Sequence, residues 1–592
     1  MVSLSLVPII LSFTLLPFFF FFFFFFLPQQ IIKIILKPKL PPGPRGLPVI
    51  GNLHQLNNSS LHLHFTNLSR KYGPLFSLKL GHRTVLVVSS PKMAKETLKD
   101  RDVLFSDRPY FLSQQKLSYN GIEIIFSPHG DYWKEIRKIC VIHIFSAKRV
   151  SSFSYIREDE VHRMIRKISG YADSCKVINL DEVLISLAST TICRVAFGRS
   201  YEEEGVENSR FYGMMTEFQE LMGTFFMSDY IHFTGWIDSL KGLTGRLERN
   251  FKDLDAFYQQ VIDEHLDPQR PKPQEEDIVD VFLRLKNQPW FSINLTFDHL
   301  KALLMDFLAG GTDTVAAISV WAMSQLMKNP RVMQKVQEEV RNLYGHDHQK
   351  GFIQESDVKK LTFLKAVVKE TLRLHPPAPL LAPRETTKSC IIQGFEIPAK
   401  TTVYVNAWAI HRDPEAWDDP EVFYPERFLN NAIDFKGQDM ELIPFGAGRR
   451  MCPGLMMGIA TVELVLANLV SSFDWEMPAG TKREDIDFEV VTGLVTHKKN
   501  HLWLVAKNPI CKALKASCVQ WSHRYLQAAT QSSSKSHNLE ALAEKDRNLL
   551  VVIPPDMPPH DAYYFLLFSG YSNLLLQLSI ALIGFLKGNR GL

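Results

Sequence analysis

Residues 445–454, Phe-Gly-Ala-Gly-Arg-Arg-Met-Cys-Pro-Gly, constrain the fold of this chain more than any other feature. They place Cys452 behind a glycine-rich turn, and Gly446 and Gly448 allow the tight bend that such a turn needs. The apolar stretch after Cys452 predicts a helix, and the free N–H groups at a helix N-terminus stabilise a thiolate. A lone thiolate can be the axial ligand of a haem iron. The decapeptide therefore predicts that Cys452 is a haem-iron ligand.

Other residues of this segment support the same interpretation. Arg450 lies two residues before the cysteine, where its guanidinium can pair with a haem propionate. Phe445 opens the motif Phe-x-x-Gly-x-Arg-x-Cys-x-Gly, and Gly454 lets the backbone pass close to a flat macrocycle. The alternative is that Cys452 is an ordinary buried structural thiol. The motif resembles the haem-binding loop of the cytochrome P450 family, so the other motifs of that family are expected elsewhere in the chain.

Composition narrows the class of protein. The chain has 592 residues, of which 46% are hydrophobic, so it can bury a large core. With 67 basic and 63 acidic residues the net charge is +4, which argues against bulk nucleic-acid binding, and no nucleic-acid partner is expected. The 7 cysteines are scattered and include no Cys-x-x-Cys pair, a pattern typical of a reducing compartment.

The N-terminus predicts a membrane segment. Leu4 to Leu27 carries no charge and includes the phenylalanine run Phe18 to Phe26. A helix of that length spans about 36 Å, enough for a bilayer core of about 30 Å. The alternative, a cleaved signal peptide, would have a shorter apolar region and a basic start. Basic residues follow the run, so the positive-inside rule predicts a cytosolic body behind an uncleaved anchor; they are Lys33, Lys37, Lys39 and Arg45.

The remaining chain is divided by composition. Residues 1–36 form the predicted anchor, and the proline-rich residues 37–48 predict a semi-rigid hinge. Residues 49–508 show mostly helical spacing, with a small hairpin over 75–89 and further strands over 391–405, which predicts one mostly α catalytic domain. Residues 509–592 are an atypical extension. Its apolar stretch 563–586 is a candidate second membrane helix, and no function is assigned to it.

Residues 305–320 predict a buried helix that carries chemistry. Asp313 and Thr314 are costly to bury in such apolar surroundings unless they are paired or used. Gly310 and Thr314 lie on one helix face. Gly310 leaves space above a cofactor, Thr314 places a hydroxyl there, and Asp313 can connect to solvent protons, as oxygen activation requires. The alternative is that the Thr314 hydroxyl only bonds back to a carbonyl of its own helix.

Three weaker motifs complete the set. Glu370 and Arg373 are three apart and share a helix face, a spacing that by itself is mostly found in surface ion pairs. The family resemblance implies that they pair with Arg427 of Pro-Glu-Arg-Phe in a structural role. It also implies that Trp133, Arg137 and Arg384 bind haem propionates. For Trp133 and Arg137 the alternative is an amphipathic surface turn.

The resemblance covers about residues 41–508 and is closest to the plant microsomal, A-type group of specialised metabolism. Residues 118–150 resemble the branch that includes aldoxime-metabolising enzymes. The resemblance implies a single cytochrome P450 fold with haem b, a cytosolic domain at the endoplasmic reticulum membrane, and electrons from NADPH through NADPH-cytochrome P-450 reductase. The reaction would insert one atom of O₂ into a small lipophilic substrate. Two alternatives are a haem-thiolate isomerase or dehydratase, and a non-catalytic haem-binding membrane protein.

Overall fold

The computed structural model describes residues 39–508, except 57–59, 175, 201–204, 272–274, 289–290, 345–351, 492 and 494. Side chains of residues 205–210 are also outside the description. The predicted anchor 1–36, the extension 509–592 and its apolar stretch 563–586 lie outside the described residues. They therefore stay predictions.

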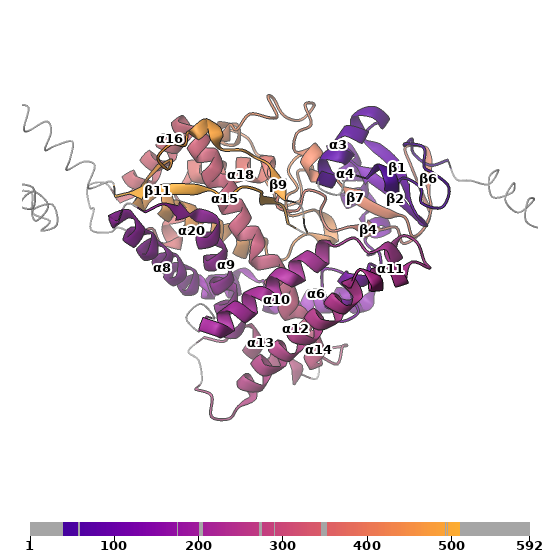
Figure 1. The fold of residues 1–592 in the computed structure, drawn as a ribbon, viewed down its shortest axis with the longest axis horizontal. Helices are drawn as coiled ribbons and strands as arrows, with labels where there is room; N and C mark the ends of the chain where they lie inside the picture. The colour runs from indigo at the N-terminus through magenta and orange to yellow at the C-terminus, as the bar shows by residue number, and fades with distance from the viewer. Residues whose placement is uncertain are drawn as a thin grey trace, which may run out of the picture. The chain divides into compact units, whose positions relative to one another are not determined.

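The described chain is mostly α (Figure 1). Its helices are α3 (Leu61–Tyr72), α4 (Pro91–Lys95), α5 (Leu112–Leu117), α6 (Asp131–His143), α7 (Ala147–Ser152), α8 (Ser154–Asp173), α9 (Leu180–Phe197), α10 (Gly205–Gly223), α11 (Gly235–Leu240), α12 (Leu243–Leu266), α13 (Ile278–Lys286), α14 (Phe297–Gly311), α15 (Asp313–Lys328), α16 (Pro330–Arg341), α17 (Glu355–Val358), α18 (Thr362–Leu374), α19 (Ala407–Ile410) and α20 (Leu455–Ser472). The prediction of a mostly α fold is confirmed.

The helices differ in how much of their circumference is apolar, and this difference decides whether a helix lies at the surface or in the core. α16 begins with Pro330 at its first turn and buries Val332, Val336 and Val340, which are four apart and so line one face. In α15, by contrast, every residue from Val315 to Met327 is buried. A helix that is apolar all round belongs in the core, and α15 packs against α9, α18 and α20.

Length and hydropathy alone would allow two described helical stretches to cross a membrane. They are Phe297–Lys328, which comprises α14 and α15, and Leu455–Ser472, which is α20. Within an apolar window of 18 residues in each stretch, 72% of the first window and 56% of the second are buried inside the protein, so both serve as core helices.

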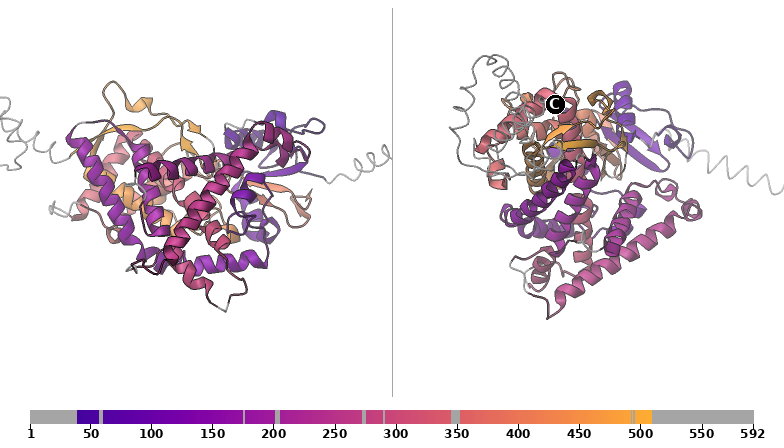
Figure 2. Two further views of the ribbon diagram at one scale, coloured as in Figure 1. Left: turned by 60° about the horizontal axis from the view of Figure 1, so that its bottom comes forward. Right: turned by 60° about the vertical axis from the view of Figure 1, so that its left-hand side comes forward.

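The strands form small sheets. They are β1 (Leu75–Leu80), β2 (Arg83–Val88), β3 (Ile178–Asn179), β4 (Arg384–Glu385), β5 (Cys390–Ile392), β6 (Phe395–Ile397), β7 (Thr402–Val405), β8 (Asp474–Glu476), β9 (Val490–Val491), β10 (His497–Lys498) and β11 (Trp503–Lys507). The largest has the order β1-β2-β7-β4, in which β2 and β7 are parallel and the other pairs antiparallel. The two views in Figure 2 show this sheet beside the helical part. The predicted hairpin and later strands are confirmed.

The described end of the proline-rich stretch is bound to the domain. The carbonyls of Pro41 and Pro42 accept hydrogen bonds from the Ser77 hydroxyl (2.7 Å) and the Ser77 N–H (2.9 Å) in β1. Gly43 lies so close to this strand that an added Cβ would come within 1.9 Å of the Ser77 carbonyl oxygen. Part of the predicted hinge is therefore hydrogen-bonded to β1 and packs against the domain.

Candidate active site

The cysteine loop is built as its glycines suggest. Gly446 (φ +69°) and Gly448 (φ +68°) both adopt the left-handed backbone region that glycine tolerates best. At Gly448 an added Cβ would also come within 2.2 Å of the Leu98 carbonyl oxygen. The loop closes through a 2.9 Å hydrogen bond from the Cys452 N–H to the Phe445 carbonyl. Helix α20 begins at Leu455, so Cys452 stands just before its N-terminus.

The Cys452 thiol lies deep in the protein and yet has free surface. Burial raises its pKa, whereas N–H groups of Gly454 and Leu455 and the charge of Arg137 lower it. The residue is nevertheless exposed. A thiol that is far from the outer surface and still exposed must border an internal space. The N–H groups of Gly454 and Leu455 point to its sulfur and stabilise a thiolate there.

Open space also borders the core helices at Gly310. Residues Lys301–Ala309 and Val315–Met327 are buried, but Gly310 between them is exposed, and a Cβ added there would meet nothing within 4 Å. Phe145 connects this region with the cysteine loop. Its ring stacks on Phe307 of α14 at 4.8 Å and would lie 3.7 Å from a Cβ added at Gly454.

The helix predicted over 305–320 is broken in the structure, which corrects that expectation. α14 ends at Gly311 and α15 begins at Asp313, with Thr312 between them. Around the break, the N–H of Thr312 and the N–H of Ala316 make long backbone hydrogen bonds of 3.4 Å. The Thr314 hydroxyl donates to the Gly310 carbonyl at 2.6 Å, the bond that the alternative interpretation expected. A side chain that competes for a helix carbonyl bends the helix at that point.

Asp313 has a partner that no sequence motif indicated. Its Oδ2 lies 3.6 Å from Nε2 of His497, which comes from β10. The two residues are distant in the chain, and a histidine at a strand start carries no local signal. Only the packing of β10 against α15 reveals the pair.

Four arginines meet beside the cysteine loop: Arg108, Arg137, Arg384 and Arg450. Burial lowers all four pKa values, and repulsion from the other arginines further lowers those of Arg108, Arg384 (to about 10) and Arg450 (to about 9). Two carboxylates lie near these arginines. Asp102 lies 3.2 Å from Arg384, and Glu123 lies near Arg108 and Arg450. Guanidinium groups stay charged in proteins, so this arginine cluster favours an additional anion.

The sequence predicted three of these arginines and missed Arg108. The Arg450 guanidinium lies 3.9 Å from the centre of the Trp133 ring, and Arg137 donates to the Met451 carbonyl in the cysteine loop. Trp133 itself donates its indole N–H to the Ile124 carbonyl at 3.1 Å. Arg108 belongs to a loop without a recognisable local motif, so only the fold brings it to the cluster.

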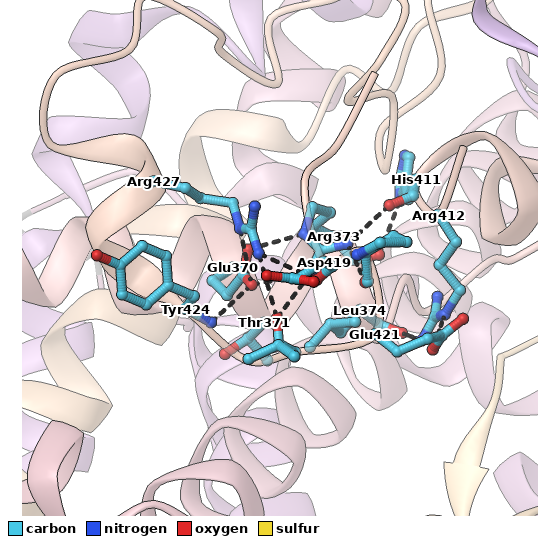
Figure 3. A network of polar contacts seen from close by, with 12 residues as sticks. Glu370, Thr371, Arg373, Leu374, His411, Arg412, Asp419, Glu421, Tyr424 and Arg427 are labelled. Atoms are coloured by element: carbon cyan, nitrogen blue, oxygen red, sulfur yellow. Dashed lines mark hydrogen bonds and ion pairs between the residues drawn. The ribbon is translucent and has the colours of Figure 1, made fainter. Parts of the chain in front are cut away.

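Glu370, Arg373 and Arg427 form a separate buried network (Figure 3). Both Glu370 oxygens lie 2.8 Å from Arg373 nitrogens, and Oε1 also lies 3.2 Å from Nε of Arg427. Glu370 and Arg373 are fully buried on α18. The Arg373 guanidinium also donates to the carbonyls of His411 (2.8 Å) and Pro420 (2.6 Å).

Comparison with known proteins decides the family. The Cytochrome P450 family model matches residues 41–505. The chain belongs to the cytochrome P450 family. A 5-OH-xanthotoxin synthase of Pastinaca sativa is 47% identical over 479 residues, covering 80% of this chain and 94% of the relative. Cytochrome P450 71A1 of Persea americana is 46% identical, with 77% and 91% covered.

Further matches agree with this result. A strychnine-11-hydroxylase of Strychnos nux-vomica is 45% identical, covering 80% of this chain and 92% of the relative. A solved zebra fish cytochrome P450 with progesterone gives a TM-score of 0.65 at 25% identity, covering 76% of this chain and 99% of that structure. The predicted fold and the plant specialised-metabolism group are thereby confirmed.

This cytochrome P450 is a haem-thiolate monooxygenase with haem b as its cofactor. It requires dioxygen, a redox partner and a lipophilic substrate. The described residues fit the cofactor. Cys452 offers a thiol with free surface, Gly310 borders open space, and the arginine cluster needs anions such as propionates.

Proposed function

We propose that this cytochrome P450 hydroxylates a ring-containing, lipophilic plant metabolite. Three relatives support the substrate class, because the names 5-OH-xanthotoxin synthase, 6,7,8-trihydroxycoumarin synthase and strychnine-11-hydroxylase all describe oxygenated ring compounds. The aldoxime-related placement of residues 118–150 stays a prediction. The observation that carries the proposal is Cys452, a deep thiol with free surface at the start of a helix.

Cys452 is proposed as the axial ligand of the haem iron. The bound haem supplies an iron centre at which dioxygen is reduced and activated. The N–H groups of Gly454 and Leu455 and the charge of Arg137 favour the thiolate form that binds iron. At the other end of the loop, the Phe445 carbonyl accepts a hydrogen bond from the Cys452 N–H. The centre of the Phe445 ring lies 5.6 Å from that of Phe435.

The arginine cluster and Trp133 are proposed to hold the propionates. Arg450, Arg384 and Arg137 now donate to carbonyls of the surrounding loops, for example from Arg384 to Ala447 at 2.9 Å. Each guanidinium has several N–H groups in a fixed fork, so it can serve a carbonyl and a carboxylate together. Trp133 would support the Arg450 guanidinium with its ring face.

Thr314 and Asp313 are proposed to manage protons on the opposite side. Gly310 keeps space open next to the Thr314 hydroxyl. That hydroxyl can accept a hydrogen bond while it donates to the Gly310 carbonyl. Asp313 is half-buried and faces His497, so it can pass protons between the interior and the surface. Glu370, Arg373 and Arg427 are proposed to be structural.

The proposal also covers the redox partner of this cytochrome P450 and its location in the cell. We infer electron supply from NADPH-cytochrome P-450 reductase, and a cytosolic domain held at the endoplasmic reticulum membrane by a single N-terminal anchor. The apolar run Phe18 to Phe26 and the basic residues after it support this orientation. The proposed parts are the anchor 1–36, the hinge 37–48, the catalytic domain 49–508 and the extension 509–592.

The ligand assignment is tested by Cys452→Ser. A thiolate-ligated haem has a distinctive carbonyl-adduct spectrum, and the variant should lose that band completely because the sulfur is gone. Cys390→Ser, a partly buried cysteine in β5, is the matched control and should keep it. A native carbonyl band in Cys452→Ser would refute the proposal.

The proton role is tested by Thr314→Ala. We expect NADPH consumption to continue while product per NADPH falls roughly tenfold or more, because a positioned proton donor contributes about 10²–10⁴-fold. Product and hydrogen peroxide are measured per NADPH consumed. Thr312→Ala is the neighbouring control. Unchanged coupling in Thr314→Ala would remove this role.

Reductase reconstitution separates the alternatives. The monooxygenase should consume NADPH and O₂ and place one labelled oxygen atom in the product. Turnover without NADPH and O₂ would instead identify an isomerase or dehydratase. Haem binding without turnover across a panel of coumarins and indole alkaloids would support a non-catalytic haem protein.

A further inference from the structure

Two buried carboxyl groups near this site have no role so far. Glu123 belongs to the loop after α5 and Asp306 to α14, and their exposed fractions are 0% and 6%. Asp306 accepts the N–H of Ile124 and Glu123 accepts the N–H groups of Ile125 and Phe126, so the two carboxyl groups lie next to each other, and each shifts the other's pKa. Carboxylates in contact away from water cannot both ionise, because like charges repel strongly there. The pair therefore holds one proton.

The contacts show which residue carries the proton. Burial raises the pKa of Glu123, but the N–H of Phe126, which donates at 2.7 Å, the N–H of Ile125 and the charge of Arg108 oppose this rise. These interactions favour ionised Glu123. Asp306 accepts only the Ile124 N–H on Oδ2, at 3.1 Å, and burial and Glu123 raise its pKa well above the usual range. Its Oδ1 finds no donor among the described residues, as expected of an oxygen that itself donates to Glu123.

The backbone carbonyls of the same loop accept hydrogen bonds from residues of the candidate active site. In residues 122–127, the Ile125 carbonyl accepts from Arg108 at 2.7 Å, and the Ser127 carbonyl accepts from Arg450 at 2.6 Å. The Ile124 carbonyl accepts from Trp133. A displacement of residues 122–127 would therefore move the partners of two arginines and the tryptophan at once.

We propose that Glu123 and Asp306 fasten residues 122–127 to α14 through a shared proton, and thereby position Arg108 and Arg450 for the anionic edge of the cofactor. Both are positioning residues, since they act through the loop. The proposal rests on the proposed function of the arginine cluster. It adds that an acid pair links α14 to the loop whose carbonyls bind Arg108 and Arg450.

The pair is sensitive to rising pH. Asp306 binds its proton more tightly in the folded protein than in the unfolded chain, so its contribution to the loop is full at low pH and is lost as the pH rises through its raised pKa. The other groups facing the pair are Arg108 and Arg450, Tyr132 and Cys140 of α6, and Tyr258 of α12. Burial raises the pKa values of Tyr132, Cys140 and Tyr258, so they stay neutral at moderate pH.

Hydrogen exchange of the holoenzyme tests this proposal, with exchange of residues 122–127 corrected for the intrinsic pH dependence. In the wild type, protection should fall from neutral to alkaline pH. Asp306→Asn keeps one donor and one acceptor without a titrating proton, so its protection should match the wild type at neutral pH and persist at alkaline pH. Asp306→Ala should exchange roughly tenfold to hundredfold faster, the effect of losing hydrogen bonds to a charged partner.

Asp298→Asn, an exposed acid at the start of the same helix, is the matched control and should behave as the wild type. An alkaline loss that persists in Asp306→Asn would refute the proposal, because it would assign the titration to another group. Equal protection in Asp306→Ala and the wild type would refute it too. If Asp306→Ala does not fold, the wild type and Asp306→Asn still decide. The carbonyl-adduct spectrum of the same samples tests the haem-thiolate assignment separately.

Discussion

Two buried clusters of charge in this protein differ in whether each guanidinium has a carboxylate partner, and in this sense one is a balanced network and the other an unbalanced cluster. In the network of Glu370, Arg373 and Arg427, one carboxylate accepts from both guanidiniums, and backbone carbonyls take the remaining N–H groups. In the arginine cluster, burial lowers the pKa values of all four guanidiniums, and only Arg384 forms an ion pair, with Asp102, among the described residues. The first arrangement is complete within the chain. The second contains guanidiniums without a carboxylate partner among the described residues and so favours an additional anion, and this difference in pairing separates the structural cluster from the proposed binding site.

The largest effect is expected when the balanced network is broken. Glu370→Ala leaves the buried Arg373 without its carboxylate and should lower the free energy of unfolding by about 3–5 kcal/mol. Denaturant titration of the holoenzyme measures it. Glu421→Ala is the control, since Glu421 pairs with Arg412 but is 68% exposed, and should cost less than about 1 kcal/mol. Equal losses would show that burial of the Glu370 network adds nothing.

The next effect concerns the unbalanced cluster and appears in cofactor binding. Arg384→Gln should weaken haem retention roughly tenfold to hundredfold, as expected for a lost charge-assisted hydrogen bond. The rate of haem transfer to apomyoglobin measures it. Arg412→Gln removes another buried guanidinium, 3.5 Å from the Trp408 ring and outside the cluster, and should leave this rate unchanged. Equal acceleration in both variants would contradict an anion site at the arginine cluster.

The smallest effect lies at the rim of the balanced network. Arg331, which is 61% exposed, lowers the pKa of Glu426, which is 13% exposed, to about 2. Ionised Glu426 therefore adds stability above its ordinary pKa of 4.5, which is lost as the pH falls towards 2. Glu426→Gln should cost less than about 1 kcal/mol at neutral pH because the pair is solvated. The difference from the wild type should shrink in acid, and a constant difference would exclude this ion pair as the cause.

Most features of the fold and site that the sequence predicted come from local motifs. The left-handed glycines of the cysteine loop, the helix after Cys452, the hairpin at Gly81 and the mostly α fold follow from neighbouring residues. The break at Thr312 was missed, because a continuous apolar stretch does not show that the Thr314 hydroxyl competes for a backbone carbonyl. The Trp133 indole N–H donates to the Ile124 carbonyl, a contact that the sequence did not indicate, and its binding to a propionate stays a prediction.

The sequence by itself determined the chemistry of this protein, since the Cys452 loop and the Gly310–Thr314 segment are contiguous and their backbone preferences are local. The tertiary structure alone decided which charges meet. Arg108 reaches Arg450, Glu123 reaches Asp306, and His497 reaches Asp313 only after distant segments pack together. Electrostatic interactions depend on distance in space and on exclusion of water, and neither quantity can be obtained from spacing along the chain.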